Sequence, residues 1–198
     1  KELFDIYACR YDRHLQETLE YQTPKDLLTI LQESTPCQFS KAVDLGCGTG
    51  LMGENLRPFC QQLHGVDLSG KMLRYAKMKG NYDTLHQQNI LEFVQQHKGF
   101  DLITACDVLI YIGNLQPLFQ AVQKALTPNG VFVFSTERTD EKRLALGLHG
   151  RFSHSRSYIE ATAHQVGLKR METKELKLRT ENHVWVNGFG YLYTNHQN

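Results

Sequence analysis

Cysteines, long apolar runs and an excess of one charge are all scarce in this sequence, and each absence excludes a class of protein. The five cysteines are scattered over 198 residues and none forms a C-x-x-C pair, which argues against a zinc knuckle or a disulfide framework and favours reduced thiols. The densest apolar run, Val131–Phe134, is far too short to cross a bilayer. Lys and Arg number 22 against 21 Asp and Glu, so we expect no global electrostatic attraction to nucleic acid or acidic membranes.

The remaining composition is typical of one folded domain in water. Hydrophobic residues make up 41% of the chain and charged residues 22%, which excludes disorder, coiled coil and collagen. Residues 1–13 are polar and amphipathic, and this pattern predicts no signal peptide. We therefore expect a cytoplasmic protein that is a monomer or a homodimer, with no membrane partner.

Short apolar segments alternate with amphipathic segments through the middle of the chain. Strand-like segments cover residues 41–45, 63–68, 84–88, 100–105 and 131–135. Helical spacing covers residues 51–60, 71–79, 91–97 and 115–126. Strands that alternate with helices predict a doubly wound parallel sheet with right-handed crossovers.

The C-terminal third breaks this alternation. After a helical segment at 157–166, extended segments cover 168–179 and 184–194. The few residues between them leave no room for a helical crossover, so these segments pair as an antiparallel hairpin. The sequence thus predicts an α/β, Rossmann-like, doubly wound sheet of seven strands, mostly parallel with a C-terminal antiparallel hairpin.

An N-terminal helical cap is expected to precede this sheet. Apolar residues recur at helical spacing over residues 2–32. Pro24 suits the first turn of the second of two helices, with Thr23 as its N-cap. We therefore divide the chain into a cap, residues 1–36, and a domain, residues 37–198, that form one structural unit.

A glycine-rich loop follows the first predicted strand. The segment Asp44-Leu45-Gly46-Cys47-Gly48-Thr49-Gly50 joins this strand to the next helix. Glycines there allow a tight turn and a close approach of backbone to ligand, and the free N–H groups of the helix point to the same place. Asp67 ends the next strand, where its carboxylate could accept hydrogen bonds from ribose hydroxyls.

The same loop also satisfies the dinucleotide pattern G-x-G-x-x-G, over residues 48–53. The position of the strand argues against this match, because the strand ends at Asp44-Leu45 and the first turn glycine is therefore Gly46. An acidic Asp44 would repel a pyrophosphate and would suit an ammonium group. A nucleoside ligand that carries an ammonium group is favoured, while an NAD-type oxidoreductase, which needs a second catalytic domain, stays an alternative.

Four ordered motifs carry a family resemblance. They are Asp44-x-Gly46-x-Gly48-x-Gly50, Gly65-Val66-Asp67-Leu68-Ser69, Phe100-Asp101-Leu102-Ile103 and Leu126-Thr127-Pro128-Asn129-Gly130. Together they resemble class I S-adenosylmethionine-dependent methyltransferases over about residues 41–137, and the terminal hairpin extends the resemblance. The opening segment 3–15, with Tyr21 and Pro24, is similar to methyltransferase domains linked to tetratricopeptide repeats and to ubiquinone-type small-molecule methyltransferases.

This resemblance implies S-adenosyl-L-methionine as cofactor and S-adenosyl-L-homocysteine as product. Asp44 would lie near the methionine amino group, Asp67 would hold the ribose hydroxyls, and Leu68 with Met72 would pack against adenine. Asn89 stands where the family often has Asp, and its amide oxygen can still accept a hydrogen bond from the adenine amino group. The implied cofactor-binding set is Asp44, Gly46, Cys47, Gly48, Gly50, Asp67, Leu68, Met72, Asn89, Ile90 and Cys106.

The N-terminal helices are expected to lie over the cofactor as a lid. Such a lid would bring Tyr7 or Tyr11 close to the sulfonium, since an aromatic face attracts a cation. Ordinary packing of these rings in the core is the alternative.

The acceptor is expected beside the connection 138–157, because long connections at the carboxyl edge of a parallel sheet bind substrates. His149, His154 and Asp107 are the candidate catalytic bases, and satisfied histidines of a solvated loop are the alternative. Tyr111 and Arg151 are the candidate substrate residues. The positive or switchable charge predicts an acidic small-molecule acceptor, and the spacing of these residues predicts no metal site.

The implied reaction is methyl transfer to a small molecule, with an oxygen or a carboxyl group favoured as acceptor. A catalytically silent cofactor-binding interaction module stays open as an alternative, as does a protein or nucleic-acid methyltransferase. The segment Cys106-Asp107-Val108-Leu109 has no Asn-Pro-Pro-Tyr-like character, which disfavours methylation of amino groups on bases or glutamine. The near-neutral charge disfavours nucleic acid.

Overall fold

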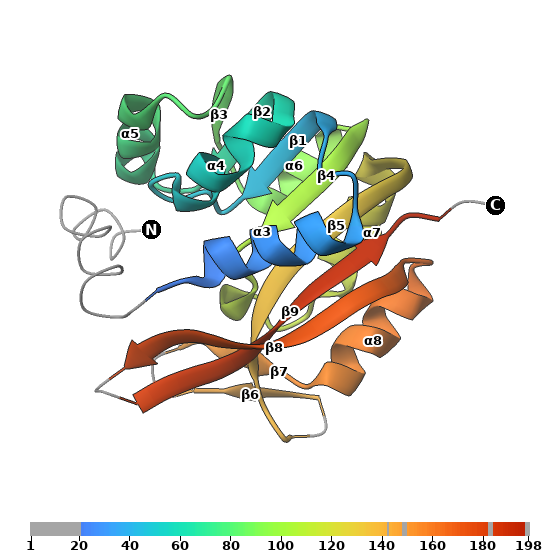
Figure 1. Cartoon of the computed structure of the whole chain (residues 1–198). Coiled ribbons are helices and arrows are strands. Elements are labelled where there is room, and N and C mark those ends of the chain that lie inside the picture. The colour runs from blue at the N-terminus through green and yellow to red at the C-terminus, as the bar shows by residue number, and fades with distance from the viewer. Residues whose placement is uncertain (1–20, 142, 148–149, 182–183, 197–198) are drawn as a thin grey trace.

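A computed structural model describes residues 21–141, 143–147, 150–181 and 184–196. These residues form one nine-stranded sheet with helices packed against it (Figure 1). The strands are β1 (Phe39–Leu45), β2 (Cys60–Asp67), β3 (Thr84–Gln87), β4 (Phe100–Ala105), β5 (Leu126–Arg138), β6 (Leu144–Leu146), β7 (Phe152–His154), β8 (Lys169–Glu181) and β9 (Val184–Thr194). The α-helices are α3 (Thr23–Ser34), α4 (Leu51–Leu56), α5 (Gly70–Lys79), α6 (Ile90–Gln96), α7 (Gln116–Ala125) and α8 (Arg156–Gln165), and the 3₁₀ turns are η2 (Arg57–Phe59) and η3 (Leu109–Tyr111).

The strand order confirms the predicted fold class. Strands β3, β2, β1, β4 and β5 lie side by side and run parallel. Strand β9 pairs antiparallel with β5, and β8 pairs antiparallel with β9. The five parallel strands end at one edge, so the loops that follow β1, β2 and β4 meet there.

Two short strands, β6 and β7, are additions to the seven that the sequence predicted. Both lie in the connection 138–157, for which the sequence predicted neither strand nor helix. Strand β4 pairs with β5 only as far as Phe134, and the longer β5 continues to Arg138 with that edge open. Strand β7 pairs there, with Ser153 opposite Glu137, and β6 adds to β7. The open edge supplies backbone partners that a three-residue strand could not find alone.

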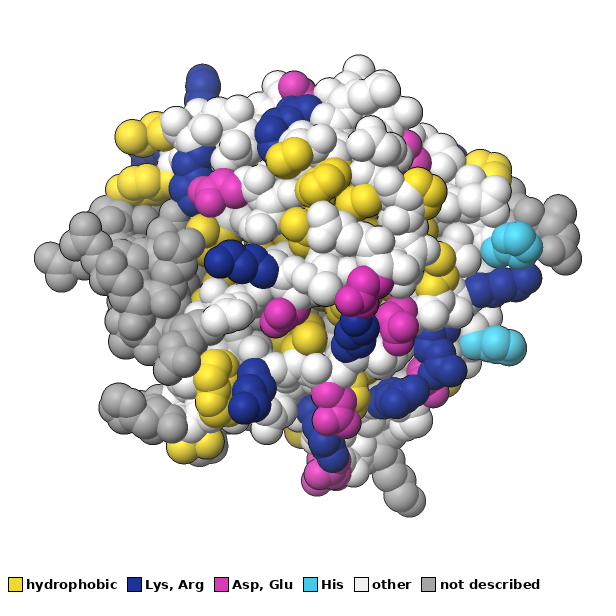
Figure 2. All heavy atoms as spheres, viewed as in Figure 1, with side chains coloured by type: hydrophobic (Ala, Val, Ile, Leu, Met, Phe, Trp, Pro, Cys, Tyr) yellow, Lys and Arg dark blue, Asp and Glu magenta, His cyan; other side chains and the backbone are white. Residues whose placement is uncertain are grey.

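The core has two layers because neighbouring residues of each central strand point to opposite faces of the sheet. On β5, Phe132 and Phe134 belong to the layer under α6, α7 and α8, whereas Val131 and Val133 belong to the layer under α3 and α4. The exposed charged side chains are of both signs, and Figure 2 shows Lys and Arg interspersed with Asp and Glu on one face. None of the helices in the described part of the chain has the length and apolar character to span a membrane.

Helix α3 lies against a face of the sheet, which corrects the lid predicted for the second N-terminal helix (Figure 1). Its apolar side chains Leu27, Ile30 and Leu31 are fully buried and belong to the same cluster as Val133 and Leu192 of the sheet. Burying such side chains is what keeps an amphipathic helix on a sheet. Only the start of α3 borders the cavity described below. The first predicted N-terminal helix lies outside the described residues.

The start of α3 and the end of α4 differ from the sequence prediction, and a proline lies near each. Thr23 does not cap α3: Gln22 holds the N-cap position, and the Thr23 hydroxyl donates to the carbonyl oxygen of Leu178 at 3.1 Å. Helix α4 ends at Leu56 instead of continuing to residue 60. Pro58 follows in η2, because a proline has no N–H to continue the helical hydrogen bonds.

Candidate functional site

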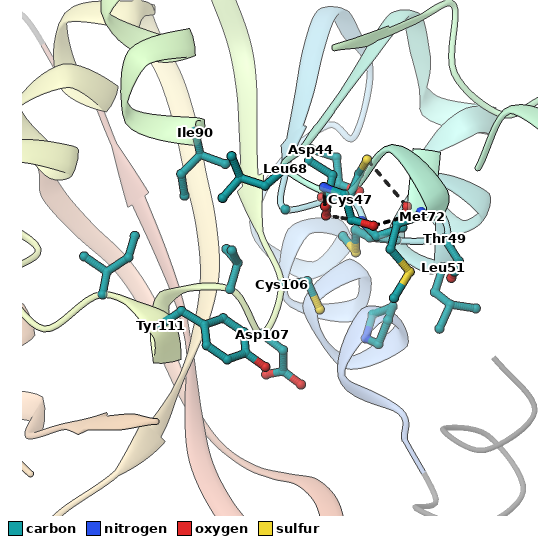
Figure 3. Close-up of a pocket in the computed structure, with 18 of the residues that line it drawn as sticks. Asp44, Cys47, Thr49, Leu51, Leu68, Met72, Ile90, Cys106, Asp107 and Tyr111 are labelled. Atoms are coloured by element: carbon teal, nitrogen blue, oxygen red, sulfur yellow. Dashed lines mark hydrogen bonds between the residues drawn. The ribbon is translucent and has the colours of Figure 1, made fainter. Parts of the chain in front are cut away.

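A cavity of about 380 Å³ opens at the carboxyl ends of β1, β2 and β4 (Figure 3). Its walls come from residues 44–52 at and after the end of β1, 67–72 at and after the end of β2, 89–90 at the start of α6 and 106–112 after β4. Tyr21 and Pro24 close one side. In open α/β sheets this edge is where ligands bind, so the fold brings the predicted glycine loop and acidic residues to one place.

The three glycines of the loop share a left-handed backbone conformation, but their surroundings differ. Gly46, Gly48 and Gly50 have φ angles of +72°, +53° and +91°, which side chains rarely adopt. A methyl group on Gly46 would lie 2.5 Å from Val108 Cγ2, so Gly46 allows close packing of the loop after β4. A methyl group on Gly48 would meet nothing within 4 Å. Gly48 therefore exposes bare backbone beside the cavity, as close approach of a ligand requires.

Gly53, the last glycine of the apparent dinucleotide pattern, makes room for Tyr82. A methyl group on Gly53 would lie 2.4 Å from the Tyr82 hydroxyl oxygen, and one on Gly65 would lie 3.0 Å from Tyr82 Cδ1. The pattern thus reflects the packing of a tyrosine ring, and no diphosphate is needed to explain it. Nothing in the sequence near residue 82 pointed to this residue, because no motif places a tyrosine in this turn.

Asp44 is a buried carboxylate with two neutral hydrogen-bond donors. Its side chain is 1% exposed and lines the cavity. Its Oδ1 accepts a hydrogen bond from the Thr104 hydroxyl at 2.8 Å, and its Oδ2 accepts one from the Tyr82 hydroxyl at 2.6 Å. Burial raises the pKa of Asp44 to about 6, the two hydroxyls oppose this rise, and the charge of Asp67 adds to it. A cation in the cavity would lower this pKa again.

Asp67 connects the glycine loop to the start of α5. Its Oδ2 accepts a hydrogen bond from the Gly48 amide at 2.9 Å, and its Oδ1 accepts one from the Ser69 amide at 2.8 Å. Burial raises the pKa of this carboxyl group. A carboxylate has about four lone-pair sites, so these amide donors leave acceptor capacity for the hydroxyls of a ligand.

An apolar wall lies next to Asp67. Leu68, which is 50% exposed, and Ile90 line the cavity there (Figure 3). Met72 also lines the cavity. Asn89 also lines it, but its Oδ1 accepts a hydrogen bond from the Leu91 amide at 2.9 Å and caps α6. The oxygen predicted to face adenine therefore has a structural role, and its contact with adenine stays a prediction.

Asp107 and Tyr111 enter the other end of the cavity (Figure 3). Asp107 has a φ of +52°, which is unusual for a residue with a side chain. Its Oδ1 accepts a hydrogen bond from the Ser135 hydroxyl at 2.8 Å, and its Oδ2 lies 3.7 Å from Arg179 Nη1. Burial raises the pKa of Asp107, and the Arg179 guanidinium opposes this rise. The backbone conformation and these contacts hold a partly neutralised carboxylate at the cavity wall. Cys106, which belongs to the implied cofactor-binding set, lines the cavity beside Asp107.

An ion-pair network lies next to Asp107. It includes Arg151, which contradicts the prediction that Arg151 is a substrate residue. Arg179, which is 5% exposed, pairs with Glu137 and with Glu181. Arg151 pairs with the same two carboxylates, with 3.3 Å between its Nε and Glu137 Oε1. Arg151 is outside the cavity lining formed by the described residues. Counting Asp107, three carboxylates face two guanidiniums, so the described residues at this end carry no surplus positive charge for an acidic acceptor.

His154 is a core residue, which contradicts the prediction that it faces an acceptor as a base. Its side chain is fully buried. Its Nε2 donates a hydrogen bond to the Ile112 carbonyl oxygen at 2.9 Å, and its ring stacks on Tyr158 with centroids 5.7 Å apart. Burial lowers its pKa, so the ring stays neutral where β7 joins the sheet. The other predicted base, His149, and the predicted cofactor contacts Tyr7 and Tyr11 lie outside the described residues.

The comparisons with known proteins all find methyltransferases. A model of the methyltransferase domain matches residues 43–132. The ubiquinone biosynthesis O-methyltransferase of Idiomarina loihiensis is 28% identical over 146 residues, which cover 70% of this chain and 59% of that protein. The enzyme of the same name from Pasteurella multocida is 28% identical over 141 residues, or 64% of this chain and 58% of that protein. The chain thus spans about three fifths of the length of these curated relatives.

Solved structures show the same fold. The N-methyltransferase NodS from Bradyrhizobium japonicum WM9, in complex with S-adenosyl-L-homocysteine, superimposes with a TM-score of 0.71 at 20% identity, covering 88% of this chain and 86% of that one. An S-adenosylmethionine-dependent methyltransferase from Clostridium acetobutylicum superimposes with a TM-score of 0.71 at 22% identity, covering 98% and 100%.

Proposed function

We propose that the chain transfers a methyl group from S-adenosylmethionine to an oxygen atom of a small-molecule acceptor. The basis is that the chain carries a class I S-adenosylmethionine-dependent methyltransferase domain. One observation carries this proposal. The cavity places a buried carboxylate with neutral donors, a bare glycine backbone and a second carboxylate at the carboxyl ends of neighbouring parallel strands. Such a site suits a nucleoside that carries an ammonium group.

The residues present fit this cofactor. Asp44 would bind the methionine amino group, because an ammonium next to a buried carboxylate offsets the cost of burying its charge. The remaining acceptor capacity of Asp67 would bind the ribose hydroxyls. Leu68, Met72 and Ile90 would cover the adenine ring with apolar surface. When bound, the cofactor supplies a methyl group that is activated by a positively charged sulfur.

The protein's own task is to align the acceptor and to exclude water. Alignment of reacting groups can supply ~7–11 kcal/mol in favourable cases. We assign Asp107 as the catalytic base that takes the proton from the acceptor hydroxyl, since its raised pKa makes it a stronger base than an exposed carboxylate. Ser135 and Arg179 orient its two oxygens.

The acceptor we propose is neutral and partly apolar. Val108, Tyr111 and Ile112 form the wall next to Asp107, and Tyr111 is about half exposed. The acidic acceptor predicted from the sequence depended on Arg151 and on histidines. Arg151 is paired with two carboxylates, and an anionic acceptor beside Asp107 would meet like charge. The names of the curated relatives favour oxygen as the acceptor atom.

Two experiments test this function. Calorimetric titration with S-adenosylmethionine, S-adenosylhomocysteine and NAD should give micromolar binding of the first two and much weaker binding of NAD. Mass spectrometry of reactions with a panel of phenols, alcohols, carboxylates and amines should find methylated products among the hydroxyl compounds. Preferential binding of NAD, or methyl transfer to amines alone, would contradict the proposal.

A further inference from the structure

We propose that Tyr82 is a positioning residue for the cofactor, which fixes the Asp44 carboxylate in the orientation that binds the ammonium group. This inference rests on the proposed function, since it deepens the account of the same cavity. Tyr82 belongs to none of the sequence motifs and lies in the turn between α5 and β3.

The contact geometry supports a positioning role. The Tyr82 hydroxyl donates to Asp44 Oδ2 at 2.6 Å, while the Thr104 hydroxyl donates to Oδ1 at 2.8 Å. One donor on each oxygen prevents rotation of the carboxyl group about its Cβ–Cγ bond. The lone pairs that these donors leave unused remain for a ligand in the cavity that Asp44 lines.

The position of the Tyr82 ring is built into the surrounding backbone. A methyl group would lie 2.3 Å from Tyr82 Cζ if added to Gly53, 3.0 Å from Cε2 at Gly50 and 3.0 Å from Cδ1 at Gly65. The next residue, Asp83, accepts a hydrogen bond from the Leu63 amide at 2.7 Å. Three glycines therefore form a socket for this ring, and the neighbouring turn is tied to β2.

The groups around Asp44 make the hydroxyl of Tyr82 electrostatically important. Asp67 acts on Asp44 from β2, and the thiols of Cys47 and Cys106 lie within its electrostatic reach from the glycine loop and from the loop after β4. None of these groups is a cation. Burial raises the pKa of both thiols and of Tyr82 well above their ordinary values, so all three stay protonated and Tyr82 stays a donor.

Removal of the Tyr82 donor should therefore change the pH dependence of cofactor binding. The hydrogen bond from Tyr82 lowers the pKa of Asp44, which is about 6 in its presence. In the Tyr82→Phe variant this pKa should rise by about one unit, and S-adenosylhomocysteine should bind about fivefold more weakly than to the wild type at pH 6 but less than twofold more weakly at pH 8. A purely structural defect would weaken binding by a similar factor at all pH values.

The experiment is calorimetric titration of the whole chain with S-adenosylhomocysteine from pH 5.5 to 8.5. Thr104→Val removes the other donor to Asp44. The pH midpoint of S-adenosylhomocysteine binding should therefore move to higher pH, as it should in Tyr82→Phe. Tyr75→Phe is the matched control, because Tyr75 is a half-buried tyrosine of α5 outside the cavity lining formed by the described residues, and its profile should match the wild type. Site-specific incorporation of 3,5-difluorotyrosine at position 82 keeps the ring and strengthens the donor, so the midpoint should move to lower pH.

The outcomes separate this inference from the proposed function. Failure of the wild-type chain to bind S-adenosylhomocysteine at any pH would overturn the proposed function. If the wild type binds S-adenosylhomocysteine and the pH midpoint of binding is unshifted in Tyr82→Phe, the role of Tyr82 is overturned while the proposed function stands. If Tyr82→Phe does not fold, the difluorotyrosine variant decides, and an unshifted midpoint there overturns the inference.

Discussion

Replacement of Asp44 by Asn should stabilise the cofactor-free protein while weakening cofactor binding. Burial raises the pKa of Asp44 from 3.8 to about 6, so the folded protein holds the proton more tightly than the unfolded chain. Folding stability therefore falls as the pH rises from about 4 to 6, and the resulting penalty at pH 7 is about 3 kcal/mol. Asn carries no charge and is free of this penalty.

The expected gain is smaller than the penalty, because Asn cannot accept hydrogen bonds from both hydroxyls at once. Loss of the contact to Thr104 or to Tyr82 costs about 1 kcal/mol, which leaves a net gain of about 2 kcal/mol at pH 7. For a chain of this size that gain corresponds to a rise in Tm of roughly 4–8 °C. At pH 5 the gain should be about 1 kcal/mol smaller, since Asp44 is then mostly protonated in the folded state.

Denaturant unfolding at pH 5 and pH 7 measures both values, and calorimetry with S-adenosylhomocysteine measures the accompanying loss of affinity. That loss should be at least tenfold, because the ammonium group loses a charged partner. Asp140→Asn is the control: Asp140 is a highly exposed carboxylate whose replacement should change stability by no more than about 0.5 kcal/mol. A destabilised Asp44→Asn variant at pH 7, or a gain that does not shrink at pH 5, would refute the reasoning.

Three further predictions concern catalysis, packing and pH. Asp107→Asn should lower methyl transfer to hydroxyl acceptors by ~10²–10⁴-fold while S-adenosylhomocysteine binds as before in calorimetry; equal loss of both would instead make Asp107 a cofactor residue. Gly53→Ala should lower the free energy of unfolding by ~1–3 kcal/mol, because its methyl group would lie 2.3 Å from Tyr82 Cζ; an unchanged denaturation midpoint would show that the ring can move. His64 and His86 contact each other with 3.3 Å between ring nitrogens, and burial lowers the pKa of both, so their contribution to stability is lost as the pH falls below about 6.5. In denaturant titrations His86→Gln should therefore lose less stability than the wild type between pH 7 and pH 5, and parallel losses would exclude the pair as the cause.

The sequence predicted those parts of the fold in which apolar residues recur over enough positions to show the period of a strand or a helix. Alternating apolar segments marked the parallel strands, and the short connection before Val184 marked the antiparallel hairpin. The strands β6 and β7 carry no such signal, because three residues are too few to show a period. They form because β5 extends beyond β4 and leaves backbone groups to pair.

The candidate site divides in the same way. Gly48, Asp44 and Asp67 could be predicted because each lies at or just after the end of a strand, and parallel strands end at one edge. The partners of these residues could not be predicted. Tyr82 reaches Asp44 across 38 residues of sequence, and Arg151 is paired with Glu181, which is 30 residues away. Sequence reasoning therefore treated Arg151 as a free cation.

The sequence by itself determined the order of the strands along the chain, the turn at the glycine loop and the acidic residues that flank it. These depend on backbone geometry and side-chain periodicity, which act over a few residues. Only the tertiary structure decided which groups each carboxylate contacts, that His154 lies in the core, and that Gly53 holds a tyrosine ring. Such contacts depend on how distant segments pack, and because a hydrogen bond or an ion pair acts over only a few ångströms, its partner is set by the folded arrangement and not by nearness in the chain.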